Sequence, residues 1–138
     1  MTYCAGILVR DGLVMFADTR TNAGFDDVST FRKLHVLEVP EERVMAVATA
    51  GNLSVTQSAL SLLAEGLPNA ETGELETLES VPTMFRAAQL LGHAVRRVKH
   101  DLGEGLEQEH VNADVSMLLG DRTCARRSAG TARRGRIR

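Results

Sequence analysis

Short apolar runs separated by turn residues fill the first fifty positions, and this pattern restricts the fold more than any other feature. Runs of this length between turn signals are typical of β-strands rather than helices. Gly12 favours a hairpin turn after the first run, and Pro40 begins a similar turn further along. Residues 19–30 are polar and small, so we expect a loop or a short edge segment there. Two hairpins are therefore predicted, with strands at residues 3–9, 13–17, 34–39 and 43–50.

A helix is predicted directly after the fourth strand. Gly51 and Asn52 break the strand, and Asn52 has a side chain suited to cap a helix over residues 53–65. Gly66 and Pro68 are then expected to stop this helix.

A longer helix is predicted after an acidic loop at residues 69–80. Ser80 is its expected cap, Pro82 lies in its expected first turn, and Gly103 and Gly105 are expected to end it. Apolar residues at three- and four-residue steps predict one buried stripe: Phe85, Ala88, Leu91, Val95, Val98 and Leu102.

Residues 111–119 are the last predicted strand. Strands, then two helices, then a strand indicate a mixed α/β or α+β domain. The length of 138 residues fits one domain, and 43% hydrophobic residues suffice for a core.

Composition argues against several classes of protein. No apolar run reaches the length of a membrane span, and the start lacks the charge and apolar pattern of a signal peptide. Cys4 and Cys124 set no disulfide framework, so we expect free thiols and a cytoplasmic location. The histidines lack metal-ligand spacing, and we expect no metal and no organic cofactor.

The charge is distributed unevenly along the chain. Residues 1–121 carry all 18 acidic residues and nine basic ones, a net charge of −9, whereas residues 122–138 carry seven arginines. One interpretation is a basic arm that binds nucleic acid. The interpretation that we favour is a non-native ending produced by a frameshift or truncation, with a domain at 1–121 and a tail at 122–138, because the tail has no hydrophobic periodicity.

Thr2 follows the initiator methionine. Removal of Met1 would give one residue both a hydroxyl nucleophile and a free α-amine. The reference pKa of an α-amine is about 7.7–8.0, so it can act as a base near neutral pH. Threonine paired with its own amine is a recognised way of activating a weak nucleophile.

Four features occur in a particular order: Thr2, the segment 18–24, the pair Arg32-Lys33, and the segment 49–51. Together they resemble the proteasome β-type subunits of the N-terminal nucleophile hydrolases. The absence of a propeptide and the stretch 29–33 look most like the bacterial proteasome homologues called Anbu. HslV is a better-known relative of this family. The resemblance covers roughly residues 1–120. It implies an α+β fold, the four-layer αββα sandwich, here incomplete.

The resemblance also implies a role for each matching residue. Thr2 would be the nucleophile, and Lys33 would lie beside it and lower the proton affinity of its hydroxyl and amine. Asp18 would hold Lys33 charged and oriented. Gly51 would supply a backbone N–H to the developing oxyanion. The alternatives are an exposed lysine, a turn-capping aspartate and a simple strand-to-helix turn.

Substrate would lie extended in a groove and pair with backbone, as the resemblance implies. The residues expected at this groove and its side-chain pocket are Thr21, Gly24, Phe31, Thr49 and Leu53, with His35 as a further candidate that is as well explained as a surface histidine. Cys4 is expected to be a small core residue rather than a rival nucleophile.

The resemblance therefore predicts a cytoplasmic threonine-type endopeptidase subunit that assembles with copies of itself, without nucleic acid or membrane partners. No residue pattern in the chain assigns an ATPase partner. The strands of the family's C-terminal half are not represented, so the sheet that carries Thr2 is expected to have an unpaired edge and a half-covered apolar face. Two alternatives stay open, a catalytically inert fragment and an N-terminal nucleophile amidase that acts on small amides.

Overall fold

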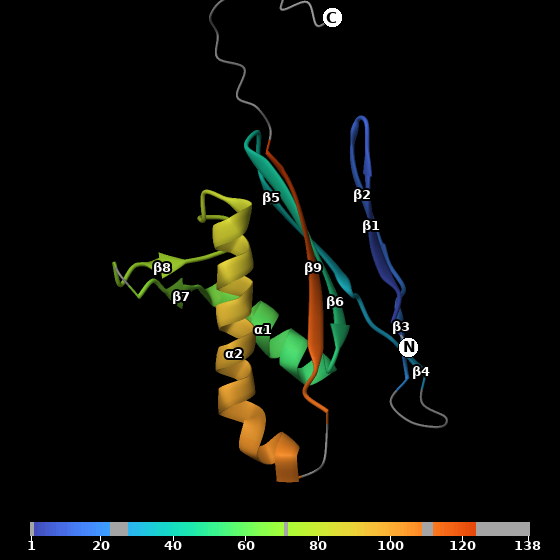
Figure 1. The fold of residues 1–138 in the computed structure, drawn as a ribbon, viewed down its shortest axis with the longest axis vertical. Coiled ribbons are helices and arrows are strands. Elements are labelled where there is room, and N and C mark those ends of the chain that lie inside the picture. The colour runs from blue at the N-terminus through green and yellow to red at the C-terminus, as the bar shows by residue number, and fades with distance from the viewer. Residues whose placement is uncertain (1, 23–27, 71, 109–111, 124–138) are drawn as a thin grey trace, which may run out of the picture.

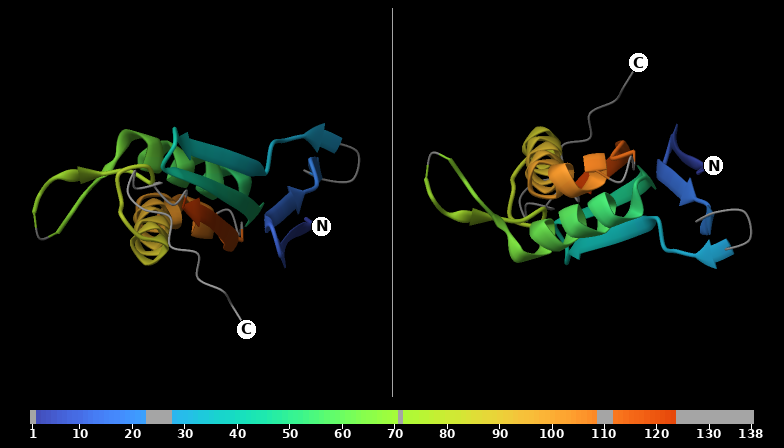
Figure 2. Two further views of the ribbon diagram at one scale, coloured as in Figure 1. Left: turned by 90° about the horizontal axis from the view of Figure 1, so that it is seen from above. Right: turned by 90° about the horizontal axis from the view of Figure 1, so that it is seen from below.

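A central antiparallel sheet lies between a layer of helices and a separate hairpin (Figures 1 and 2). This computed structural model describes residues 2–22, 28–70, 72–108 and 112–123. The strands and helices are β1 (Cys4–Val9), β2 (Gly12–Ala17), β3 (Arg20–Asn22), β4 (Val28–Thr30), β5 (Leu34–Val39), β6 (Arg43–Gly51), α1 (Leu53–Glu65), β7 (Leu67–Pro68), β8 (Leu75–Glu76), α2 (Met84–Gln108) and β9 (Val115–Thr123).

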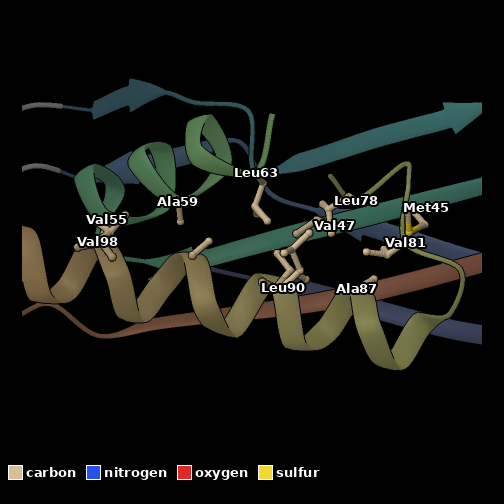
Figure 3. Packing of buried hydrophobic residues seen from close by; sticks show 12 residues of the cluster. Met45, Val47, Val55, Ala59, Leu63, Leu78, Val81, Ala87, Leu90 and Val98 are labelled. Atoms are coloured by element: carbon tan, nitrogen blue, oxygen red, sulfur yellow. The ribbon is translucent and has the colours of Figure 1, made fainter. Parts of the chain in front are cut away.

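The central sheet has the order β5-β6-β9, and both strand pairs are antiparallel. β6 is the middle strand and pairs along its whole length with β9, from Arg43 opposite Thr123 to Gly51 opposite Val115. Met45 and Val47 are 1% and 0% exposed, and Figure 3 shows both in the core with side chains of α1 and α2. A strand buried to this degree must be the centre of the fold.

The predicted hairpins are both present. β1 pairs with β2 and β5 pairs with β6, each in an antiparallel register. Of the two alternatives expected at residues 19–30, a loop or a short edge segment, the structure has the second, because β3 and β4 form a short antiparallel pair there. Phe31 N–H donates to Thr19 O (2.7 Å), so this pairing continues beyond β4.

α1 begins and ends where the sequence predicts. Asn52 caps the helix, and its side chain accepts a hydrogen bond from Val55 N–H (3.0 Å). Gly66 has φ of +94° and donates its N–H to Leu62 O (2.9 Å), which favours glycine because residues with a Cβ rarely adopt this conformation.

Both predicted ends of α2 were wrong. Thr83, not Ser80, makes the capping bond: its Oγ1 accepts from Arg86 N–H (3.2 Å), whereas Ser80 bonds with Thr77. Pro82 precedes the helix. The backbone remains helical through the predicted stop at Gly103 and ends at Gln108.

The buried stripe of α2 is also rotated from its predicted position. Phe85 is 70% exposed and Ala88 is exposed, whereas Leu91 and Val98 are buried as expected. Successive helix positions are about 100° apart, so a stripe centred one residue away exposes part of the predicted set. The residues that α2 buries are Ala87, Leu90, Leu91, Ala94 and Val98.

The segment between the helices is more ordered than the predicted loop. β7 and β8 pair to form a two-stranded arm that projects from the body (Figure 2). Leu78 and Val81 bring the chain back into the core, and each is 2% exposed (Figure 3).

β9 lies further along the chain than the predicted strand at 111–119. It includes Arg122, which falls in the predicted tail and pairs with Val44. Asp121 forms a two-bond ion pair with Arg43, in which Nε and Nη2 each lie 2.8 Å from a carboxylate oxygen. This buried pair shows that the sequence fits the sheet through Asp121. Residues 124–138 of the predicted tail lie outside the described residues.

The β1–β2 hairpin makes strand pairs only within itself among the described residues. Its side chains are apolar on both faces, and many are exposed; Leu8 is 84% and Tyr3 68% exposed. A groove of about 490 Å³ separates part of the hairpin from the central sheet. The expected unpaired edge and half-covered apolar face are therefore present. None of the helices in the described ranges is long and apolar enough to cross a membrane.

Candidate active site

The Lys33 ammonium joins three segments of the chain. Its Nζ donates to Thr2 Oγ1 (3.2 Å), Asp18 Oδ1 (2.9 Å) and the carbonyl oxygen of Arg20 (2.5 Å). These three acceptors match the three N–H groups of a lysine. The Lys33 side chain is 7% exposed, and a buried charge requires such partners.

The hairpin register places Thr2 near Asp18. Cys4 pairs with Ala17 at the end of β1–β2, and Tyr3 continues the pairing: its carbonyl accepts from Asp18 N–H (2.9 Å), and its N–H donates to Asp18 Oδ1 (3.1 Å). The hydrogen bond from Lys33, and then that from Tyr3, hold the pKa of Asp18 below its ordinary value. The carboxylate therefore stays ionised beside the lysine.

The main chain of Lys33 is fixed to the central sheet. Its carbonyl accepts from Thr49 N–H (2.8 Å) and from Thr49 Oγ1 (3.4 Å). Lys33 directly precedes β5 of the central sheet, whereas Thr2 directly precedes the paired part of the hairpin. The contact between them is a direct link between the two sheets.

Gly51 ends β6 next to this contact. Thr49 N–H donates to Lys33 O, and N–H groups two residues apart in a strand point the same way, so strand geometry predicts that Gly51 N–H lies on this same side of β6. On the opposite side, Asn52 N–H donates to Asp114 O (2.9 Å). Gly51 has φ of +106°, and a Cβ there would overlap the Asp114 carbonyl, so only glycine fits.

A small pocket of about 30 Å³ lies between Thr2 and the start of α1. Three of the predicted groove residues line it, namely Phe31, Thr49 and Leu53. Thr56 was not predicted here, although it follows Leu53 by one helical turn and this spacing could have identified it. The full lining is Thr2, Phe31, Lys33, Thr49, Ala50, Gly51, Leu53 and Thr56.

The remaining predicted residues have different outcomes. Thr21 lies on β3 opposite Ser29, and Gly24 falls outside the described residues. His35 is not in the lining of this pocket. Its Nε2 is buried and makes no hydrogen bond within the described part of the chain, and burial, followed by the charge of Arg32, lowers its pKa.

Cys4 lies in β1, two residues from Thr2, and its Sγ donates to Thr49 O (3.6 Å). Burial, and then the charge of Asp18, raise the pKa of the thiol. A thiol that keeps its proton is a poor nucleophile, as expected, but Cys4 is only partly buried and lies outside the core, so the prediction of a small core residue was wrong.

No protein-family model and no curated protein matches the chain. Solved structures of Anbu do match it. Anbu, named as an ancestral β-subunit, from Yersinia bercovieri is 38% identical, with a TM-score of 0.72 over 89% of this chain. In both sequence and fold, the chain is similar to these Anbu structures over about 90% of its own length. A helical assembly of the Anbu complex from Pseudomonas aeruginosa is 32% identical, with a TM-score of 0.73 over 91% of this chain.

A third match is a Gly-1 mutant of Anbu from Hyphomicrobium sp. strain MC1, with 33% identity and a TM-score of 0.71 over 91% of this chain. The chain spans about half the length of these Anbu structures, 48% or 49% of each. Anbu structures have the N-terminal nucleophile hydrolase fold. The helix layer, central sheet and hairpin described above are an incomplete version of its αββα sandwich.

Proposed function

We propose that the chain is a threonine-type endopeptidase subunit of a proteasome-like complex. The observation that carries this proposal is the position of the Lys33 ammonium, 3.2 Å from Thr2 Oγ1 and 2.9 Å from Asp18 Oδ1. A cation at this distance stabilises a developing alkoxide on the threonine. Burying a lysine costs free energy, and this cost favours a role for its charge at the threonine hydroxyl in addition to holding the hairpin.

The proposed reaction begins when removal of Met1 exposes the α-amine of Thr2. The amine accepts the hydroxyl proton, directly or through water, while Oγ1 adds to the carbonyl carbon of the scissile peptide bond. The carbonyl oxygen then becomes an oxyanion. Gly51 N–H, which borders the same pocket, is directed to stabilise that oxyanion, and the N-terminus of α1 adds a favourable dipole.

Collapse of this intermediate expels the amine half of the substrate, which takes the proton from the threonine amine. An ester between Thr2 Oγ1 and the acyl half remains. Water then adds to the ester carbon with the same amine as base, and the carboxylic acid leaves with Thr2 restored. The chain's own groups therefore supply the nucleophile, the base and the oxyanion donor.

The proposal includes assembly with copies of the same chain into rings or stacks, in the cytoplasm, where peptide substrates would enter a shared chamber. The Anbu complex from Pseudomonas aeruginosa forms a helical assembly, and this self-association of a relative supports the proposal for the present chain.

Intact-protein mass spectrometry after incubation with a tripeptide epoxyketone tests the chemistry. We expect loss of Met1 and one adduct, which peptide mapping places on Thr2. Lys33→Ala should abolish the adduct, whereas Lys99→Ala, at the only other lysine, should leave it unchanged. A retained Met1, or no adduct with the wild-type chain, would contradict the mechanism and favour an inert subunit.

A further inference from the structure

Two segments that are far apart in the sequence are joined by hydrogen bonds next to Gly51. Asn52 Nδ2 donates to the carbonyl oxygen of Asn112 (3.0 Å) across a separation of 60 residues. Asn52 N–H donates to Asp114 O (2.9 Å), and Asp114 N–H donates to Asn112 Oδ1 (2.7 Å). The connection between α2 and β9 is therefore fixed to the turn that joins β6 to α1.

The turn needs such a support. The peptide between Ala50 and Gly51 can rotate through coupled changes of ψ and φ, and glycine permits this because it has no Cβ. A rotated peptide would direct Gly51 N–H away from the pocket that Thr2 borders. The Asp114 carbonyl occupies the space beside Gly51 Cα and also holds Asn52 N–H. Asn52 N–H belongs to the peptide after Gly51, so these contacts hold Gly51 Cα and that peptide in place. The pairing of Ala50 with Ser116 restrains the peptide before Gly51.

We propose that Asn112 is a positioning residue for the oxyanion-binding N–H of Gly51, acting through Asp114 and Asn52. This inference rests on the proposed function, because it assigns a support to the same site. Asn112 itself is exposed and is not among the residues that line the pocket. The side-chain oxygen of Asn112 accepts from Asp114 N–H, and the carbonyl oxygen of Asp114 accepts from Asn52 N–H, next to Gly51.

Asn52 has two separable hydrogen bonds. Its Oδ1 accepts from Val55 N–H and caps α1, while its Nδ2 reaches Asn112. Serine caps a helix about as well as asparagine but lacks the Nδ2 donor. Asn52→Ser therefore keeps the cap and removes only the link to Asn112. This separates a role in oxyanion positioning from a role in helix stability.

The test measures the rate of adduct formation between Thr2 and a tripeptide epoxyketone, whose ketone oxygen becomes an oxyanion when Oγ1 adds. The full chain is used as wild type, Asn112→Ala, Asn112→Asp and Asn52→Ser. Aspartate at position 112 keeps an oxygen that can accept from Asp114 N–H, so it is the conservative control. The rate constant at saturating probe, the half-saturating concentration and the final labelled fraction are recorded separately.

We expect Asn112→Ala and Asn52→Ser each to lower the rate constant about tenfold, less than the 10²–10³-fold cost of losing an oxyanion donor outright. The half-saturating concentration should stay constant, and Asn112→Asp should recover the wild-type rate constant. The double variant should lose no more than either single variant, because both remove one linked support.

Other results would overturn the inference. A merely structural role would lower the labelled fraction and leave the rate constant of the labelled molecules unchanged. Equal rate constants in wild type and Asn112→Ala would also reject it while leaving the proposed function intact. Absence of labelling in the wild-type chain would instead reject the proposed function, and the positioning role with it.

Discussion

At the scale of single residues, one buried cation organises the candidate site. Lys33 contacts Thr2, which lies two residues before β1, Asp18, which follows β2, and the main chain of β3. A single charge therefore links the proposed nucleophile to the central sheet. Asp18 makes this arrangement possible, because burying an ammonium at this depth without an opposite charge beside it would be costly.

Asp18→Asn should remove an acid-sensitive part of the stability. The pKa of Asp18 lies below its ordinary value of about 3.9, chiefly because Lys33 donates a hydrogen bond to it. A carboxyl group of this kind stabilises the fold fully above its unfolded pKa, and the contribution is lost as the pH falls through the folded pKa. The difference in free energy of unfolding between wild type and Asp18→Asn should thus be constant near neutral pH. It should shrink below about pH 4.

Urea unfolding of both proteins at a series of pH values measures this difference. Asp11→Asn is a suitable control, because Asp11 lies in the turn of the same hairpin and outside the Lys33 cluster. Its pH dependence should follow that of the wild type. Parallel curves for Asp18→Asn and the wild type would show that the ion pair adds nothing to stability.

At the scale of elements, Thr83 and Ser80 both carry a hydroxyl near the start of α2, but only Thr83 caps the helix. Thr83→Ala should destabilise the protein by about 0.5–2 kcal/mol, the usual cost of losing a helix cap. It should also speed hydrogen exchange at Arg86 N–H, which donates to the Thr83 hydroxyl. Thr83→Ser should restore both values. Ser80→Ala should leave exchange at Arg86 unchanged, because Ser80 bonds with Thr77. Faster exchange at Arg86 in Ser80→Ala, and unchanged exchange in Thr83→Ala, would show that Ser80 is the cap.

Elements set by local chemistry were predictable, and those set by distant contacts were not. The two ends of α1 were predicted correctly because Asn52 and Gly66 each bond to a residue within about one helical turn. A short edge segment was one expectation for β3–β4, but its pairing was not predicted, because the pairing depends on tertiary register rather than on strand propensity. The end of α2 was misplaced because an interior glycine costs only about 1 kcal/mol, which packing can offset.

The candidate site shows the same division. The resemblance pointed to Thr2, Asp18 and Lys33, and the structure brings their side chains together. The support from Asn112 and Asp114 could not be predicted, since its hydrogen bonds join segments 60 residues apart and carry no local sequence signal.

At the scale of the whole molecule, the proposed nucleophile Thr2 is attached to the least supported part of the fold. The central sheet has a covered face and a middle strand paired on both sides. The hairpin has one strand pair and large exposed apolar side chains, and isolated two-stranded hairpins are marginally stable at best. It is held by the Lys33 cluster and by a close approach of Leu13 and Met15 to Gly120.

Native-state hydrogen exchange should therefore divide the protein into two parts. Amides of β1 and β2 should exchange through local opening, faster than those of β6, which should need global unfolding. Lys33→Ala should speed exchange in β1 and β2 further, because it removes the polar link between the sheets, while amides at the middle of β6 should change only with global stability. Lys99→Ala is the matched control and should leave the hairpin at the wild-type rate. Equal protection of β2 and β6 in the wild type would mean that the hairpin folds and unfolds with the central sheet. Unchanged exchange of β1 and β2 in Lys33→Ala would mean that Lys33 is not the contact that holds the hairpin in place.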